Sequence, residues 1–160
     1  MKRKYYFAYI FLLFAAILGC DKGLEPQPVT TSYVNGMIHY VDNYDNWLAA
    51  DSIKDLRVVA FKNFPPTSVF EEVLSGRAYF TNQSLPTFVD SSAFSLEIAD
   101  APATMNYIAV VQQFGGIMDW RVVGLYSVIK DSAAVLEVRQ GKIYNLRIDV
   151  DFKNLPKQPF

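Results

Sequence analysis

Apolar and polar residues alternate strictly near the end of the chain, in segment 144–152. The apolar residues at every second position are Tyr144, Leu146, Ile148, Val150 and Phe152, and the residues between them are all polar or charged. Successive side chains of a β-strand point to opposite faces, whereas a helix would spread these five around its circumference. The pattern therefore predicts a β-strand with one buried face and one solvated face.

Seven further segments are rich in β-branched, aromatic and other apolar residues: 33–41, 56–61, 77–81, 94–98, 106–112, 121–128 and 135–139. Proline, glycine and Asn/Asp-rich stretches separate them at hairpin-like intervals. The one helical signal is Ser68-Val-Phe-Glu71, which has capping-box spacing. We therefore expect an all-β domain, an antiparallel β-sandwich of about seven or eight strands, with at most one short helical turn on a connection.

Four of these segments carry a family resemblance. They are Val34-Asn-Gly36-Met-Ile-His-Tyr40, Phe94-Ser-Leu-Glu-Ile98, Asn106-Tyr107-Ile108-Ala-Val110 and Val138-Arg-Gln-Gly141-Lys-Ile-Tyr144. Their order resembles that of carboxypeptidase-regulatory-like and transthyretin-like domains. The resemblance implies a transthyretin-like or immunoglobulin-like sandwich without catalytic residues of its own. The segment before Phe94 lacks the family's usual Asp/Asn-Gly turn, which leaves the sheet order open.

The first residues of the chain have the features of an export signal. Basic residues at positions 2–4 precede an uncharged run of 14 residues, 5–18. A helix needs about 20 apolar residues to cross a bilayer, so this run is short for a membrane span and typical of a secretory signal peptide. The run ends in Ile17-Leu18-Gly19-Cys20.

These four residues resemble the lipobox of bacterial lipoproteins. The resemblance implies cleavage before Cys20, diacylglyceryl modification of its thiol, and acylation of the new N-terminus by a fatty acid such as palmitate. The alternative is an uncleaved anchor helix beside an incidental thiol. Cys20 is the only cysteine in the chain, so neither an internal disulfide nor a cysteine-based zinc site is expected.

We therefore expect a signal peptide over 1–19, a lipidated, proline-containing tether over 20–31, and a single β-sandwich domain over 32–160. Removing 1–19 takes away three of the 15 Lys and Arg and none of the 16 Asp and Glu, which leaves 12 against 16 and a net charge of -4. A mildly acidic domain is not expected to bind nucleic acid. The expected location is the extracytoplasmic face of a bacterial cell-envelope membrane, inner or outer.

No catalytic motif accompanies these features. The only histidine, His39, lies in the first expected strand and is interpreted as structural, with a hydrolase using His39 as a minor alternative. The paired carboxylates Glu71-Glu72 and Asp149/Asp151 are interpreted as solvated or charge-balanced. The acidic loop from Asp42 to Asp51 does not match the EF-hand spacing, so an Asx-rich turn is favoured over a calcium site. No cofactor and no metal are expected.

The strongest sign of a binding site is aromatic. Tyr44 and Trp47 lie among Asp42 and Asp45, and an exposed aromatic ring beside acidic side chains can stack on a sugar or anchor a protein. The competing interpretation is that these rings close one end of the sandwich as a small core. The sequence thus predicts a non-enzymatic, membrane-anchored lipoprotein with a binding or structural domain. The alternative is a glycan-binding accessory lipoprotein that uses these loop residues.

Overall fold

The computed structural model describes residues 31–129 and 132–160. The expected signal peptide over 1–19, Cys20 and the tether up to residue 30 lie outside the described residues. The elements are β1 (Ser32–Tyr40), η1 (Asn43–Asn46), η2 (Ala50–Ser52), β2 (Asp55–Phe61), α2 (Val69–Leu74), β3 (Ala78–Phe80), β4 (Ser91–Ile98), β5 (Ala103–Met105), β6 (Tyr107–Gln113), β7 (Trp120–Leu125), β8 (Ser127–Ile129), β9 (Ser132–Ala133), β10 (Leu136–Val138) and β11 (Ile143–Val150). Each of the eight expected strands overlaps an observed one, so the β-rich class is confirmed. Among the helices of the described residues, none has the length and apolar character needed to cross a membrane.

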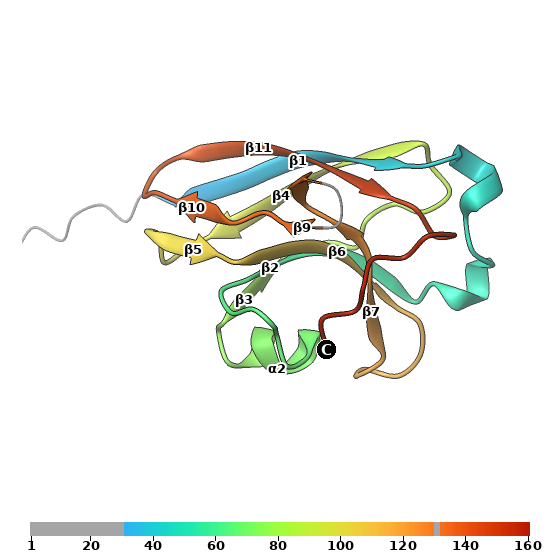
Figure 1. Cartoon of the computed structure of the whole chain (residues 1–160), viewed down its shortest axis with the longest axis horizontal. Coiled ribbons are helices and arrows are strands. Elements are labelled where there is room, and N and C mark those ends of the chain that lie inside the picture. The colour runs from blue at the N-terminus through green and yellow to red at the C-terminus, as the bar shows by residue number, and fades with distance from the viewer. Residues whose placement is uncertain (1–30, 130–131) are drawn as a thin grey trace, which may run out of the picture.

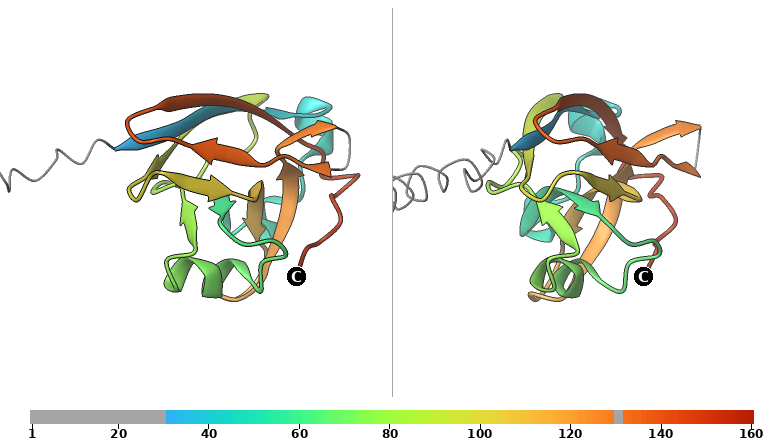
Figure 2. Two further views of the ribbon diagram at one scale, coloured as in Figure 1. Left: turned by 60° about the vertical axis from the view of Figure 1, so that its left-hand side comes forward. Right: turned by 90° about the vertical axis from the view of Figure 1, so that its left-hand side faces the viewer.

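Seven strands form one hydrogen-bonded sheet in the order β3-β2-β6-β7-β11-β1-β4. The sheet curves until its edge strands, β3 and β4, lie close together, so it is nearly closed as a barrel (Figures 1 and 2). Strands β7 and β11 join its two halves through a single paired position, Gly124 with Val150. Two small ladders, β5 with β10 and β8 with β9, complete the strand pairing among the described residues.

The sheet is mixed, and the expectation of a purely antiparallel sheet is wrong. Strands β1 and β11 run parallel, from Tyr33 opposite Ile143 to Tyr40 opposite Val150. Alternating apolar and polar residues report which face of a strand is buried, but not the direction of its neighbour. Parallel neighbours need a long connection, and these two strands are the first and the last of the described residues.

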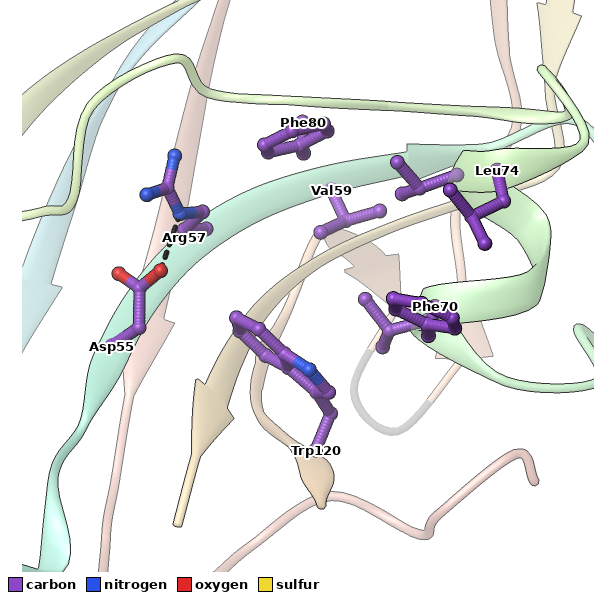
Figure 3. Close-up of a pocket in the computed structure, with 9 residues that line it drawn as sticks. Asp55, Arg57, Val59, Phe70, Leu74, Phe80 and Trp120 are labelled. Carbon is purple, nitrogen blue, oxygen red and sulfur yellow. Dashed lines mark hydrogen bonds and ion pairs between the residues drawn. The ribbon is translucent and has the colours of Figure 1, made fainter. Parts of the chain in front are cut away.

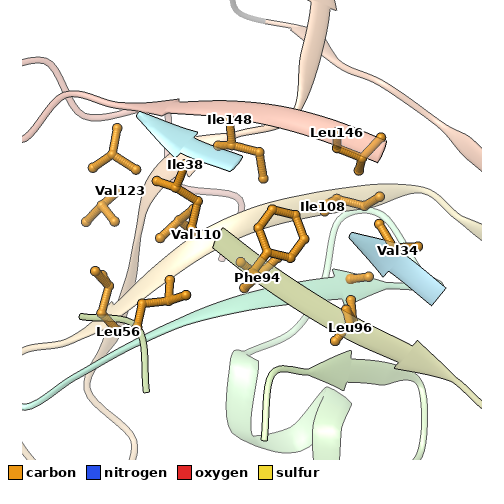
Figure 4. Close-up of a cluster of buried hydrophobic side chains, with 14 of the residues drawn as sticks. Val34, Ile38, Leu56, Phe94, Leu96, Ile108, Val110, Val123, Leu146 and Ile148 are labelled. Carbon is orange, nitrogen blue, oxygen red and sulfur yellow. The ribbon is translucent and has the colours of Figure 1, made fainter. Parts of the chain in front are cut away.

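Two hydrophobic clusters lie on opposite faces of the sheet. The main core fills the inside of the curved sheet, and its members include Val34, Ile38, Leu56, Phe94, Ile108, Val110, Val123, Leu146 and Ile148 (Figure 4). A smaller cluster on the outside packs Val59, Val111 and Val122 against Val69 of α2. Both faces of β6 are therefore buried, which explains why its sequence is apolar throughout.

Gly36 is half-buried, at the position where β1 passes over the ring of Phe94 on β4. A Cβ atom at position 36 would lie 2.6 Å from Cε1 of Phe94 and would also meet the carbonyl oxygen of Leu146. Only glycine therefore allows the ring to cover the strand at this position.

Within residues 31–129 and 132–160, helical structure occurs at three short segments, α2, η1 and η2, where the sequence predicted at most one. Helix α2 begins where expected, because Oγ of Ser68 accepts a hydrogen bond from the N–H of Glu71 at 3.2 Å. The two 3₁₀ segments lie in the acidic connection between β1 and β2. Such single turns produce no sustained helical periodicity, so the pattern of apolar residues does not reveal them.

Candidate functional site

Trp47, at the end of the acidic loop, is packed into an aromatic cluster. Its ring centroid lies 4.4 Å from that of Tyr40, 5.0 Å from that of Phe152 and 5.2 Å from that of Phe88. The indole N–H donates to the carbonyl oxygen of Val89 at 3.2 Å. The polar atom of Trp47 is thus satisfied within the protein, and its ring packs against the main core.

The two acids before Trp47 are exposed. Asp42 precedes η1 in a left-handed conformation (φ 57°), and Asp45 lies within η1. Their neighbour Asn46 is buried, and its Nδ2 donates to the carbonyl of Val41 at 2.9 Å and to Oδ1 of Asp151 at 3.0 Å. Asn154 and Asn46 donate hydrogen bonds to Asp151 and hold the pKa of its carboxyl below the ordinary value.

The side chain of Tyr44 lies outside the described part of the structure. The structure therefore places Asp42, Asp45 and Trp47 on one loop, with the acids in solvent and the indole turned to the core. Within residues 31–129 and 132–160, no group of three or more His, Cys, Asp or Glu side chains is arranged to hold a metal ion.

A cavity of about 300 Å³ lies elsewhere, on the outer face of the sheet beneath α2. Its walls are Val69, Phe70, Val73 and Leu74 of α2, Asp55, Arg57 and Val59 of β2, Phe80 of β3 and Trp120 of β7. Figure 3 shows Phe70 and Leu74 on the helix, Phe80 at the neighbouring strand and Trp120 across the opening. The volume is at the lower end of the range for small-molecule sites, and the lining is predominantly apolar, as in most such sites.

The helical wall of this cavity is held by a buried acid. The side chain of Glu72 is 3% exposed, and its carboxylate accepts hydrogen bonds from Nε of Arg77 at 3.0 Å and from Oγ1 of Thr67 at 2.8 Å. The hydrogen bond from Arg77 is the main reason why the pKa of Glu72 lies below its ordinary value. We call the hydrogen bonds of Glu72 with Arg77 and Thr67 the clamp. Since α2 has only six residues, the clamp and the Ser68 cap position it on the sheet.

One end of the cavity is polar. Nε of Arg57 donates to Oδ2 of Asp55 at 2.6 Å, and Nη1 donates to the carbonyl oxygen of Thr81 at 2.6 Å. The guanidinium also lies over the ring of Phe80, with Cζ 5.4 Å from the ring centroid. This end is electrically balanced, so it can orient a polar group of a ligand without demanding a full charge.

The opposite wall is apolar even though it contains an indole. Nε1 of Trp120 donates to the carbonyl oxygen of Ile117 at 2.8 Å, within the β6–β7 hairpin. Its polar atom is therefore already bonded, and the ring offers mainly carbon surface to the cavity. The arrangement is suited to hold a small, mostly apolar ligand with one polar end.

The other residues considered from the sequence do not join this cavity. His39 lies on the outer face of β1, with Nδ1 3.4 Å from Oδ1 of Asp149 on β11. Nε of Arg147 donates to the same carboxylate oxygen at 3.2 Å. No hydroxyl nucleophile is hydrogen-bonded to His39 among the described residues. Glu71 is exposed to solvent, whereas Glu72 is buried and bonded to Arg77 and Thr67. The two adjacent carboxylates therefore do not act as a pair.

The cavity residues were missed at the sequence level. No motif in the sequence marks Trp120 or Phe70 as a binding residue. These two residues come together only in the folded chain, because α2 packs against β2 and β7. The one available signal was the apolar Phe70, Val73 and Leu74 spacing, which indicates a helix face without naming what it covers.

Comparison of the chain with protein-family models, with curated proteins and with solved structures finds no match in any of the three.

Proposed function

We propose that this chain is a lipid-anchored cell-envelope lipoprotein whose β-rich domain binds a small, mainly apolar ligand in the cavity under α2. The role is binding and not catalysis. The observation that carries the ligand site is the cavity of about 300 Å³ with aromatic walls and one ion pair at its end. The anchor is supported by the sequence alone, through the apolar run and Cys20.

The physical case for a ligand rests on the two kinds of surface in the cavity. Apolar walls gain about 25 cal/mol for each Å² removed from water, so an apolar ligand body is favoured there. The Asp55–Arg57 pair is about four-fifths buried and lies at one end, where it can receive a hydrogen-bonding group of the ligand. Together they select an amphiphile over a sugar or a fully apolar molecule.

The binding test uses residues 31–160, which contain all the strands and core residues described above. The probe is 1-anilinonaphthalene-8-sulfonate, an aromatic amphiphile, and its fluorescence is titrated against the folded fragment. Leu74 is 72% exposed at the mouth of the cavity, so Leu74→Asp places a charge there at little cost to folding. We expect at least about a tenfold weaker affinity for the variant, equivalent to about 1.4 kcal/mol.

Ile129→Asp is the matched control, because Ile129 is 73% exposed and does not line the cavity. It should leave the affinity for the probe unchanged. Equal binding by both variants and the wild type, with unfolding temperatures unaltered, would show that the probe does not occupy this cavity and would contradict the ligand site.

The anchor is tested separately on the full chain, expressed in a bacterium. Cys20→Ser should move the protein out of the detergent phase in a phase-partition assay, because the acylated thiol is the proposed membrane attachment. Unchanged partitioning would contradict lipidation and leave the cavity proposal untouched.

We also propose that the domain is a transthyretin-like sandwich in its architecture. Two facing groups of strands support this, β4-β1-β11 and β3-β2-β6-β7, because a single paired position links them. An experimental structure tests the proposal by its strand order. The glycan-binding alternative requires the exposed acids Asp42 and Asp45.

A further inference from the structure

The polar end of the cavity under α2 has more free hydrogen-bond donors than free acceptors. A guanidinium presents five N–H groups. In Arg57, Nε uses one of them on Oδ2 of Asp55, and Nη1 uses one on the carbonyl oxygen of Thr81. Among residues 31–129 and 132–160, no other acceptor is hydrogen-bonded to this guanidinium, so most of its N–H groups are left for a ligand.

The acceptors at this end are already in use. Oδ1 of Asp55 accepts the N–H of Leu56 at 2.8 Å, and Oδ2 accepts Nε of Arg57 at 2.6 Å. The carbonyl oxygen of Thr81 accepts Nη1 of the same arginine at 2.6 Å. An N–H group that is cut off from water without a partner is less well tolerated than an oxygen that already has one hydrogen bond. A ligand group that covers this end must therefore supply an acceptor.

The unused donors are accessible and held in place. In the described part of the chain, the one buried side-chain polar atom without a hydrogen-bond partner is Oδ1 of Asn46, so the free Nη2 of Arg57 is not enclosed. Arg57 lines the cavity, and its guanidinium is fixed by Asp55 on one side and by the ring of Phe80 on another (Figure 3). Donors that are ordered before the ligand arrives save part of the entropy cost of binding.

The balance of charge favours an uncharged acceptor over a carboxylate. Asp55 and Arg57 are the only charged residues among those that line the cavity, and their charges cancel. A ligand carboxylate would place a second anion beside Asp55 and lose much of its hydration, with no unpaired positive charge to compensate for the loss. A carbonyl oxygen accepts the same N–H groups at a much smaller cost of dehydration.

We propose that the ligand of the cavity under α2 is a small, uncharged carbonyl compound, such as a ketone, an ester or an amide, whose oxygen accepts hydrogen bonds from Arg57. Arg57 is then the residue that determines specificity, and the apolar walls receive the body of the ligand. It rests on the proposed binding function and adds the chemistry of the ligand's polar group, because apolar walls alone would accept any small amphiphile.

The first experiment compares three ligands on wild-type residues 31–160 by isothermal titration calorimetry. Nonan-2-one and nonan-2-amine share one carbon skeleton, but the ketone only accepts hydrogen bonds, whereas the amine is a cation at neutral pH and only donates them. Nonanoate supplies a charged acceptor on a chain of the same length. We expect the ketone to bind at least about tenfold more tightly than either ion, which corresponds to about 1.4 kcal/mol.

Two outcomes of this comparison would overturn the proposal. An affinity for the amine equal to or above that for the ketone would assign recognition to the carboxylate of Asp55. An affinity for nonanoate equal to or above that for the ketone would show that the cavity takes anionic amphiphiles. Because this comparison needs no substitution, it decides the class of ligand even if a variant of Arg57 fails to fold.

The second experiment replaces the proposed specificity residue. Arg57→Met keeps an unbranched apolar chain beside Phe80 but has no N–H group to donate. We expect its affinity for nonan-2-one to fall about tenfold, because the hydrogen bonds to the carbonyl oxygen are lost. Naphthalene has no hydrogen-bonding group, so its affinity should be unchanged. A parallel loss of ketone and naphthalene binding in a folded variant, checked by its unfolding temperature, would overturn the role of Arg57.

Arg121 provides the matched control. Its guanidinium carbon lies 5.4 Å from the ring centroid of Phe114, the distance at which that of Arg57 lies from Phe80, but Arg121 does not line the cavity. Arg121→Met should therefore leave both affinities unchanged, and a loss of ketone binding equal to that in Arg57→Met would contradict the assignment.

Leu74→Asp separates this proposal from the proposed function. It should weaken the binding of naphthalene and of nonan-2-one alike, because it places a charge at the mouth of the cavity. Naphthalene binding that is lost in Leu74→Asp, together with a wrong order of the three nonyl ligands, would overturn only the carbonyl ligand. Binding of all ligands that is insensitive to Leu74→Asp would overturn the cavity as a ligand site, and with it both proposals.

Discussion

The two tryptophans of this chain lie in opposite kinds of environment. Trp47 contacts three aromatic rings, those of Tyr40, Phe88 and Phe152, and packs against the main core. Trp120 forms one wall of a cavity of about 300 Å³ on the outer face of the sheet. Both indole N–H groups donate to backbone carbonyls, so the difference lies in the packing of the rings and not in their hydrogen bonding.

This difference decides which tryptophan can serve a ligand. A ring with neighbours at 4.4 to 5.2 Å already uses its surface for folding, and a ligand would have to displace part of the core to reach it. A ring beside a cavity has surface to offer without such a cost. The sequence alone suggests the reverse, that Trp47 is the ligand-binding tryptophan, because its acidic neighbours resemble a binding loop.

Replacing each tryptophan by alanine gives the largest expected effect. Trp47→Ala leaves a hole in the aromatic cluster and should lower the free energy of unfolding by about 3–5 kcal/mol. Trp120→Ala only widens an existing cavity and should cost about 1–2 kcal/mol, within the usual range for single substitutions. Urea unfolding followed by circular dichroism measures both values on residues 31–160, and equal losses would remove the distinction between the two sites.

A smaller effect is expected from the carboxylates that support each site. Glu72→Gln weakens the clamp on α2 beside Trp120, and Asp151→Asn weakens the hydrogen bonds to Asn46 beside Trp47. Hydrogen bonds to charged groups contribute about 1.5–3 kcal/mol, so we expect a loss of up to that size for the buried Glu72 and less for Asp151. Probe binding in the cavity should weaken with Glu72→Gln alone, and fluorescence titration checks this.

Both carboxyls also make stability depend on pH. The pKa of each is lower in the folded protein than its ordinary value, so the unfolded chain binds more protons as the pH falls. Their contribution is complete above the ordinary values of about 4.3 for Glu and 3.9 for Asp, and is lost as the pH falls through the lowered folded values. Each variant should show a flatter loss of stability between neutral and acid pH than the wild type, and an unchanged profile would contradict the role of that carboxyl.

The sequence predicted the strands well because their information is local. Segment 144–152 forms β11 almost throughout, and Ser68 caps α2 as its spacing with Glu71 indicated. The parallel pairing of β1 with β11 was not predictable in this way, because it depends on how distant strands meet. The cavity was missed for the same reason, since Phe70 and Trp120 are 50 positions apart and only the fold brings them together.

The smallest effect is expected at the exposed acids of the Trp47 loop. Asp42→Ala with Asp45→Ala should change the free energy of unfolding by less than about 0.5 kcal/mol, as is usual for surface positions away from structural contacts. These two substitutions also test the glycan-binding alternative more cleanly than Trp47→Ala, because loss of Trp47 would weaken folding and binding together. If a glycan array shows binding by the wild-type domain that vanishes in the double variant, the loop is a ligand site despite its packed tryptophan. If millimolar calcium raises the unfolding temperature of the wild type but not of the double variant, the loop is a cation site. We expect neither result, because the indole that would stack on a sugar is turned to the core, and the described residues bring no third acidic side chain to these two.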